Sequence, residues 1–171
     1  MKTFKKILVL GLSVSMLLSL AGCSKKTIDA DKFKDVMDDM DYDVSVEDDE
    51  DDLDNGQEEA GYAYDDDDDY MAAYVKYEDK DDAIDDYEDM VDDIKDAKKD
   101  DEFDGKISES GFGNYKKLVV NGEFDDSDEY GDQTVYMVVY RIDNTIVSVI
   151  SYDNDKKDIK EVDKILKELG Y

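Results

Sequence analysis

Three segments carry apolar residues at spacings of three and four, which predicts amphipathic helices. The first covers residues 29–40, the second about 79–98, and the third begins near residue 155 and ends before Gly170. Each apolar stripe defines one buried helix face, and the stripes comprise Phe33, Val36, Met37 and Met40; Ala83, Ile84, Tyr87, Met90, Val91, Ile94 and Ala97; and Ile159, Val162, Ile165, Leu166 and Leu169.

The ends of these helices carry recognisable signals. Thr27 or Asp29 can cap the first helix, because a short polar side chain accepts a hydrogen bond from the free amides of the first turn. Gly170 suits the left-handed position that ends the third helix, and Tyr171 can fold back on Leu166 in a Schellman motif. The last residue of the chain is therefore expected to be structural.

Other segments alternate between apolar and polar residues, or are rich in β-branched and aromatic residues, which predicts strands. They cover residues 41–46, 57–64, 70–77, 115–121, 134–142 and 145–152. The segment 134–142 is apolar on both sides, so it is expected inside the sheet. Asp143-Asn144 forms a short hairpin turn, and Asp65 to Asp69 forms the tip of another hairpin.

Polar segments separate these elements. The stretch after the second helix contains Gly105, Gly111 and Gly113, and it is predicted to be a loop, as is the acidic stretch 125–132. Glu47 to Asp54 has the composition of a disordered segment. The order is αβββαβββα, which predicts an α+β fold in which three helices cover a mostly antiparallel sheet of about six strands.

The N-terminal segment predicts the location of the protein. Lysines at positions 2, 5 and 6 precede an apolar stretch, residues 7–20, which is too short to span a bilayer and fits a signal-peptide core. Leu20-Ala21-Gly22-Cys23 resembles the bacterial lipobox. The resemblance implies that a diacylglyceryl group is attached to the Cys23 thiol, that residues 1–22 are cleaved off, and that the new amino end is often acylated. The alternative is an uncleaved anchor helix followed by a buried free cysteine.

This interpretation divides the chain into three parts. Residues 1–22 are the signal peptide, residues 23–28 a lipidated tether, and residues 29–171 a single α+β domain on the extracytoplasmic face of the cell membrane. Two acyl chains hold a protein stably on a bilayer, whereas one holds it marginally. We therefore expect stable anchoring through Cys23.

A second resemblance extends over most of the chain. The lipobox is followed by a helix and the Tyr42-Asp43-Val44 pattern, then by Tyr-Met-Val-Val-Tyr-Arg-Ile-Asp-Asn-Thr at 136–145 and by Leu-Lys-Glu-Leu-Gly-Tyr at 166–171. These motifs resemble those of small surface lipoproteins of clostridia and related one-membrane bacteria, whose function is uncharacterised. The shared motifs are structural and imply no catalytic residue, but they favour a one-membrane host.

Charge and composition exclude several classes of partner. The chain has 50 acidic and 21 basic residues, and cleavage before Cys23 would remove three lysines and move the net charge from −29 to −32. Nucleic acid is excluded as a partner because its binding needs clustered lysine and arginine. The chain has no histidine and one cysteine, so a zinc site of the usual Cys/His type is not expected.

The same composition argues against an enzyme and against a named metal site. Nucleophile–base pairs based on histidine or a free cysteine are absent, and so are the Ser-x-x-Lys and Gly-x-Ser-x-Gly motifs. Asp143 lies beside a hydrophobic hairpin, but its place in a turn explains it. The EF-hand template fails in every window tested, at Leu53 counting from Asp51, at Gly111 counting from Asp100 and at Tyr130 counting from Asp126. We expect no cofactor and name no metal-ligating or catalytic residue.

The remaining hypothesis is a non-catalytic binding or interaction module with an unknown partner. Tyrosines near the acidic loops are candidate contact residues, or alternatively pack the edges of the sheet, and they are Tyr62, Tyr64, Tyr70, Tyr74 and Tyr130. An acidic and aromatic surface would attract a basic protein or peptide. The alternative function is low-affinity binding or buffering of divalent cations such as calcium.

Overall fold

The fold is built on one antiparallel sheet of seven strands in the order β1-β2-β3-β7-β6-β5-β4. The computed structural model describes residues 26–49, 53–54, 56–67, 69–127 and 131–171. The strands are β1 (Asp43–Glu47), β2 (Gln57–Tyr64), β3 (Tyr70–Tyr77), β4 (Phe103–Phe112), β5 (Tyr115–Ser127), β6 (Gly131–Ile142) and β7 (Thr145–Ser151).

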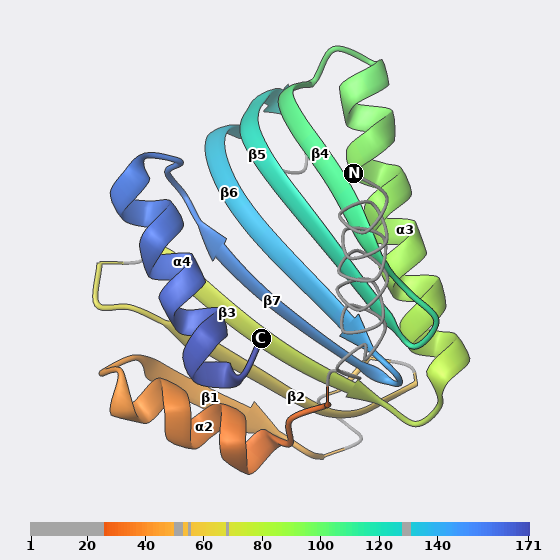
Figure 1. The fold of residues 1–171 in the computed structure, drawn as a ribbon, viewed down its shortest axis with the longest axis vertical. Helices are drawn as coiled ribbons and strands as arrows, with labels where there is room; N and C mark the ends of the chain where they lie inside the picture. The colour runs from red at the N-terminus through yellow and green to blue at the C-terminus, as the bar shows by residue number, and fades with distance from the viewer. Residues whose placement is uncertain (1–25, 50–52, 55, 68, 128–130) are drawn as a thin grey trace, which may run out of the picture.

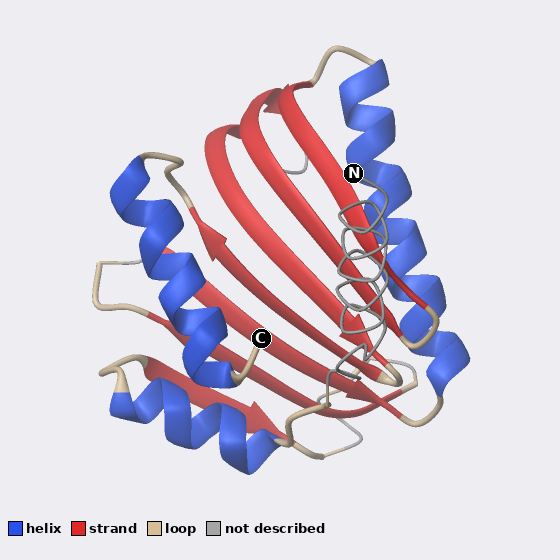
Figure 2. Ribbon diagram, viewed as in Figure 1, coloured by secondary structure: helices blue, strands red, loops and turns tan. Residues whose placement is uncertain are grey.

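Three helices cover the two faces of this sheet unequally (Figures 1 and 2). Helices α2 (Ala30–Asp39) and α4 (Lys156–Leu169) lie side by side on one face, which we call the α2/α4 face. Helix α3 (Lys80–Lys99) crosses the opposite face, the α3 face, toward β4. The α+β class, the antiparallel sheet and the three helices predicted from the sequence are therefore confirmed, with seven strands instead of about six.

The additional strand is β4, where a loop was predicted around Gly105 and Gly111. β4 pairs with β5 in a register that places Gly105 opposite Gly122. A Cβ atom on Gly105 would approach the carbonyl oxygen of Asn121 to 2.5 Å, and the ring of Phe103 lies over the same spot. The glycines therefore permit close strand contact under an aromatic ring instead of marking a loop. The predicted acidic loop 125–132 was also too long, since β5 continues to Ser127 and β6 begins at Gly131.

Aspartates begin the three helices in the described part of the chain. Asp29, Asp79 and Asp155 are the N-caps, and each carboxylate accepts backbone N–H groups of the first turn. Those backbone bonds, with the one from Lys157 the largest effect, lower the pKa of the Asp155 carboxyl below its ordinary value. Part of the acidic composition is thus used where negative charge is favourable beside the positive end of a helix dipole.

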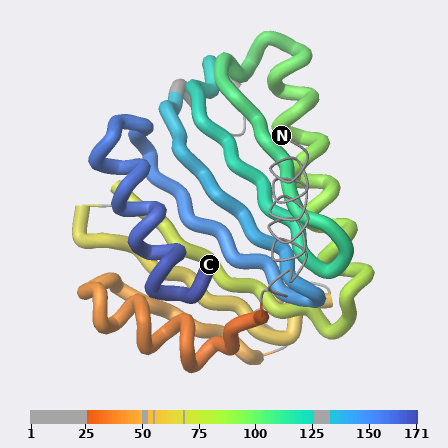
Figure 3. Tube along the Cα trace, viewed as in Figure 1, coloured from red at the N-terminus to blue at the C-terminus, as the bar shows by residue number. Residues whose placement is uncertain are grey.

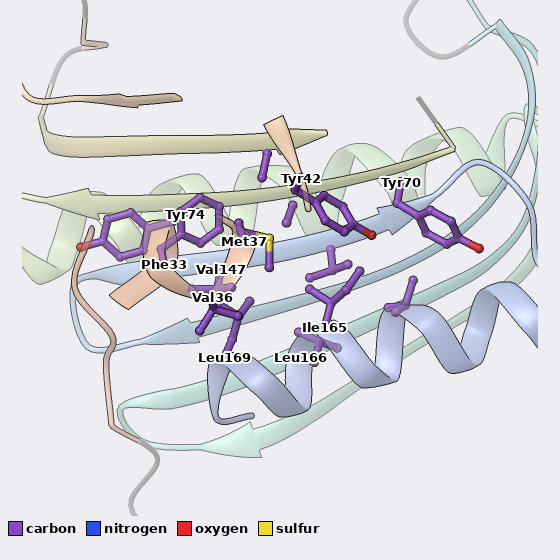
Figure 4. Close-up of a cluster of buried hydrophobic side chains, with 14 of the residues drawn as sticks. Phe33, Val36, Met37, Tyr42, Tyr70, Tyr74, Val147, Ile165, Leu166 and Leu169 are labelled. Carbon is purple, nitrogen blue, oxygen red and sulfur yellow. The ribbon is translucent and has the colours of Figure 1, made fainter. Parts of the chain in front are cut away.

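The α2/α4 face contains the larger core (Figure 4). Phe33 stacks on Tyr74 of β3, with 5.8 Å between ring centroids, and the stripe of α4 packs beside them. The end of α4 is fixed by the predicted Schellman motif, because Gly170 adopts φ 103° and the N–H of Tyr171 donates to the carbonyl oxygen of Leu166 at 2.8 Å. The ring of Tyr171 stacks on Tyr140 at 5.0 Å, so the C-terminal residue belongs to the core.

The α3 face contains a second core beneath one flank of α3. Tyr87, Val91 and Ile94 of the helix pack on strand residues that include Leu118 and Val120. Phe103 and Phe124 close this core with ring centroids 4.7 Å apart. A single helix cannot cover a face of this width, and the uncovered part forms the candidate site.

Candidate partner-binding groove

A groove runs along the flank of α3 that faces away from β4. Its deeper part has a volume of about 430 Å³ and a floor formed by β3, β7, β6 and the end of β5. The lining residues are Met71, Met90, Ile94, Phe124, Gln133, Val135, Met137, Ser148, Ile150 and Tyr152. The alternation of side chains along the strands places one side of each strand in this groove and the other in the α2/α4 core.

Three methionines give the groove an adaptable surface. Met71 comes from β3, Met137 from β6 and Met90 from α3, and all three are half-buried. Methionine has three rotatable bonds and a polarizable sulfur, so a methionine surface can fit apolar partners of different shapes. Met37, in contrast, is fully buried in the α2/α4 core and has a packing role.

The groove continues into a second hollow of about 380 Å³ that is lined by carboxylates. Met90 and Ser148 border both hollows, and Asp86, Asp89 and Asp93 of α3 line the second one. These aspartates follow each other at spacings of three and four, so they form one edge of the helix. The groove therefore has an apolar floor beside a negatively charged wall.

Local contacts explain how the wall is held. The hydroxyl of Tyr77 donates to Oδ2 of Asp86 at 2.6 Å, and burial followed by this hydrogen bond raises the pKa of Tyr77 above its ordinary value. The ion pairs among the described residues use other carboxylates, so neither Asp89 nor Asp93 is neutralised by a neighbouring lysine. Their charge is available to an incoming cationic group.

Of the tyrosines proposed from the sequence as contact residues, some are buried in a core and others are at least partly exposed. Tyr70 and Tyr74 are buried in the α2/α4 core, so they pack and do not contact a partner. Tyr62 is half-buried and Tyr64 is 40% exposed at the end of β2. The side chain of Tyr130 lies outside the described residues. The groove instead contains Tyr152, which is 36% exposed.

The other positions considered from the sequence form no chemical site. Asp143 adopts φ 52° in the β6–β7 turn, and its Oδ2 accepts a hydrogen bond of 3.1 Å from Nδ2 of Asn114, which agrees with a turn role. Among the described residues, no group of three or more acidic side chains is arranged to hold a metal ion. Cys23 and the segment before it lie outside the described residues. None of the helices in the described part of the chain has the length and apolar character needed to span a bilayer.

Comparison with other proteins adds no further identification. No family model matches the chain, and neither the curated proteins nor the solved structures include a significant match.

Proposed function

We propose that the protein is a membrane-anchored extracytoplasmic lipoprotein that acts as a non-catalytic binding module. In this proposal Cys23 carries the lipid, and the groove beside α3 receives an apolar segment of a basic partner. The observation that supports it is the combination of a methionine-lined floor with an acidic wall on the same side of one helix.

The two parts of the groove would contribute differently to binding. Each leucine- or phenylalanine-sized side chain that enters the apolar part would contribute about 1.5–3 kcal/mol before the costs of association. The aspartates of α3 would accelerate association with a cationic segment and select against an anionic one. A basic amphipathic helix satisfies both conditions, because it presents an apolar and a cationic surface together.

The test uses a soluble form that begins at Ser24 and contains every described helix and strand. A synthetic leucine–lysine helix of about 18 residues is titrated into protein labelled at the methionine methyl groups, and NMR signals are followed. The signals of Met71, Met90 and Met137 are expected to shift while that of Met37 stays in place. A peptide with glutamate in place of lysine should leave all four signals unchanged.

A matched pair of charge variants tests the role of the wall. Asp89→Asn with Asp93→Asn removes two charges beside the groove, and Glu88→Gln with Asp92→Asn removes two from the other flank of α3, where these side chains border Lys95 and Glu109. The first pair should slow peptide association several-fold at low salt, and the second pair should change it little. Equal effects of the two pairs would contradict a specific groove.

A further inference from the structure

A further hollow, which we call the hairpin hollow, lies on the other flank of α3, between this helix and the β4–β5 hairpin. It has a volume of about 220 Å³ and shares no lining residue with the partner-binding groove. Helix α3 runs alongside β4 in the opposite direction (Figure 3), and an ion pair between Lys95 and Glu109 joins the two elements at 2.8 Å. The polar lining residues of the hairpin hollow are Tyr87, Glu88, Asp92, Lys95, Glu109 and Lys116.

Tyr87 contributes a buried hydroxyl to this hollow. The residue is 2% exposed, and its hydroxyl oxygen has no hydrogen-bond partner among the described residues. The buried tyrosines Tyr70, Tyr74 and Tyr77, in contrast, each donate to a carboxylate. Buried hydroxyl groups in proteins are normally hydrogen-bonded. The Tyr87 hydroxyl is therefore a binding position for an external acceptor.

The ring of Tyr87 lies over Arg141. The guanidinium carbon is 6.0 Å from the ring centroid, and the arginine is 3% exposed. Its terminal nitrogens donate to the carbonyl oxygens of Asp143 and Gly113, whereas its Nε is buried and has no acceptor in the described part of the chain. None of the ion pairs between described residues includes Arg141. Its positive charge therefore acts on the space around Tyr87.

Lys116 places a second positive charge beside Arg141. The register of β5 and β6 puts these two residues directly opposite each other, and Lys116 borders the hairpin hollow. Lys116 also takes part in none of the ion pairs between described residues, whereas Lys95 lies 2.8 Å from a carboxylate oxygen of Glu109 and 3.8 Å from one of Asp92. The sheet side of the hollow thus carries two cationic groups without a paired carboxylate.

The helix side of the same hollow is negatively charged. Glu88 and Asp92 of α3 are exposed and lie one helical turn apart. Burial, and next the charge of Glu109, raise the pKa of Tyr87 to about 12, while Arg141 lowers it. The phenol therefore keeps its proton at neutral pH and can donate it to an acceptor. The hollow presents cations and an O–H donor on one side and carboxylates on the other.

We propose that the hairpin hollow binds a small zwitterion of the α-amino acid class. The carboxylate of the ligand accepts hydrogen bonds from the Tyr87 hydroxyl and the Lys116 ammonium, and its ammonium faces Glu88 at the rim. A simple anion would be repelled by the rim carboxylates and by the net charge of −29, and a simple cation would be repelled by Lys116 and Arg141. A zwitterion satisfies both sides.

Entry of the ligand requires a side-chain movement. The hydroxyl of Tyr87 is closed to solvent, and Lys116, which borders it on the sheet side, has a long flexible side chain that can turn aside. This site lies on the opposite flank of α3 from the partner-binding groove, so it does not depend on that groove or on the lipid anchor.

The single arginine of the chain provides the reporter for a test. The full chain, purified in a mild detergent, is labelled with ¹⁵N-arginine, so that the one Nε–H signal in its NMR spectrum belongs to Arg141. Glycine, sodium acetate and methylammonium chloride are titrated separately at constant ionic strength. Glycine is expected to shift the signal to saturation with an affinity at least about tenfold higher than that of either single-charge compound.

Variants assign the binding position. Tyr87→Phe and Lys116→Gln should each weaken glycine binding at least about fivefold, because each removes a donor to the carboxylate. Lys106→Gln changes a lysine of the same hairpin that does not line the hollow, and it should bind glycine as the original chain does. Thermal unfolding followed by circular dichroism checks that every variant is folded.

Three results would overturn the proposal. An Arg141 signal that glycine does not shift to saturation would mean that water alone occupies the hollow. Acetate that binds as tightly as glycine would exclude recognition of a zwitterion. Unchanged glycine binding in both Tyr87→Phe and Lys116→Gln would place the ligand elsewhere on the molecule.

Discussion

The hydroxyl of Tyr70 donates a 2.5 Å hydrogen bond to Oδ1 of Asp158, which joins β3 to α4 across 88 positions of the chain. Both residues are buried, at 6% and 8% exposure. Burial, and next the hydrogen bond to Asp158, raise the pKa of Tyr70 above its ordinary value. This contact joins the first turn of α4 to the first residue of β3.

Replacement of Tyr70 by phenylalanine is predicted to destabilise the fold by about 1–3 kcal/mol, because it leaves a buried carboxylate without its donor. Urea denaturation followed by circular dichroism measures the change. Tyr152→Phe, at an exposed tyrosine, provides the control and should have almost no effect. If the two variants are equally stable, the Tyr70–Asp158 bond makes no net contribution.

Because several tyrosines are buried, we predict that the free energy of unfolding falls at alkaline pH. Burial raises the pKa of Tyr87 and that of Tyr171 to about 12, and it raises the pKa of Tyr74 and Tyr77 further. Since the fold favours the neutral phenol, this stabilisation is complete below pH 10, near the ordinary pKa of tyrosine, and is lost as the pH rises toward 12.

The measurement is a pH titration of tyrosine absorbance at 295 nm in parallel with far-ultraviolet circular dichroism. Secondary structure should persist up to about pH 10. The buried group should ionise at higher pH, together with unfolding. Ionisation of all tyrosines in one step near pH 10, with the fold intact, would contradict the observed burial.

Arg141, the one arginine of the chain, connects two hairpin turns. Its side chain is only 3% exposed. Its guanidinium donates hydrogen bonds to the carbonyl oxygen of Asp143 at 3.3 Å and to that of Gly113 at 3.4 Å. The same group lies 6.0 Å from the centroid of the Tyr87 ring. Lysine cannot reproduce this planar fork. Arg141→Lys is therefore predicted to loosen the contact between the turns at a cost of about 1–3 kcal/mol.

Hydrogen exchange can localise that effect. The amide of Asp143 donates to the carbonyl oxygen of Asn114 at 2.8 Å and thus reports the junction between the turns. Its exchange should accelerate in Arg141→Lys more than the exchange of amides in the middle of β7. Uniform acceleration over the whole sheet would instead indicate a global loss of stability without a local role.

Replacement of Cys23 by alanine tests the lipid anchor. The variant should be released from membranes or should remain unprocessed, because the thiol that accepts the lipid is absent. Fractionation of cells, with a mass measurement of the N-terminal peptide, distinguishes these results. Substitution of the neighbouring Ser24 by alanine keeps the thiol and should fractionate as the original chain does. Unchanged fractionation of the Cys23 variant would contradict the lipobox interpretation.

The helices and the inner strands were predictable because their signals are local. The stripe of α4 and the cap at Gly170 follow from spacing and from the tolerance of glycine for positive φ. β4 was missed because its glycines become favourable only when Gly105 meets Gly122 across the strand pair beneath Phe103. That contact is created by pairing, and no property of residues 103–112 alone reports it.

The groove also depends on strand pairing, and for that reason it could not be predicted from the sequence. Met71, Met90 and Met137 are far apart in the sequence and converge only because β7 places β3 and β6 on either side of itself. Tyr70 and Tyr74 lie near acidic segments in the sequence, but the strand period turns both toward the α2/α4 core. The acidic and aromatic composition therefore did not indicate which tyrosine side chains are exposed in the fold.

The place of β7 between β3 and β6 also determines the order in which the molecule can be completed. A chain made or delivered from its N-terminus presents β1–β3 and β4–β6 as two separate ribbons until residues 145–151 arrive. Each ribbon then has an open inner edge, which is a template for pairing with another molecule. The last strand closes both edges at once, and α4 follows to cover it. The sheet is therefore complete only when the last strand is in place, and a chain cut before Thr145 would retain two open strand edges.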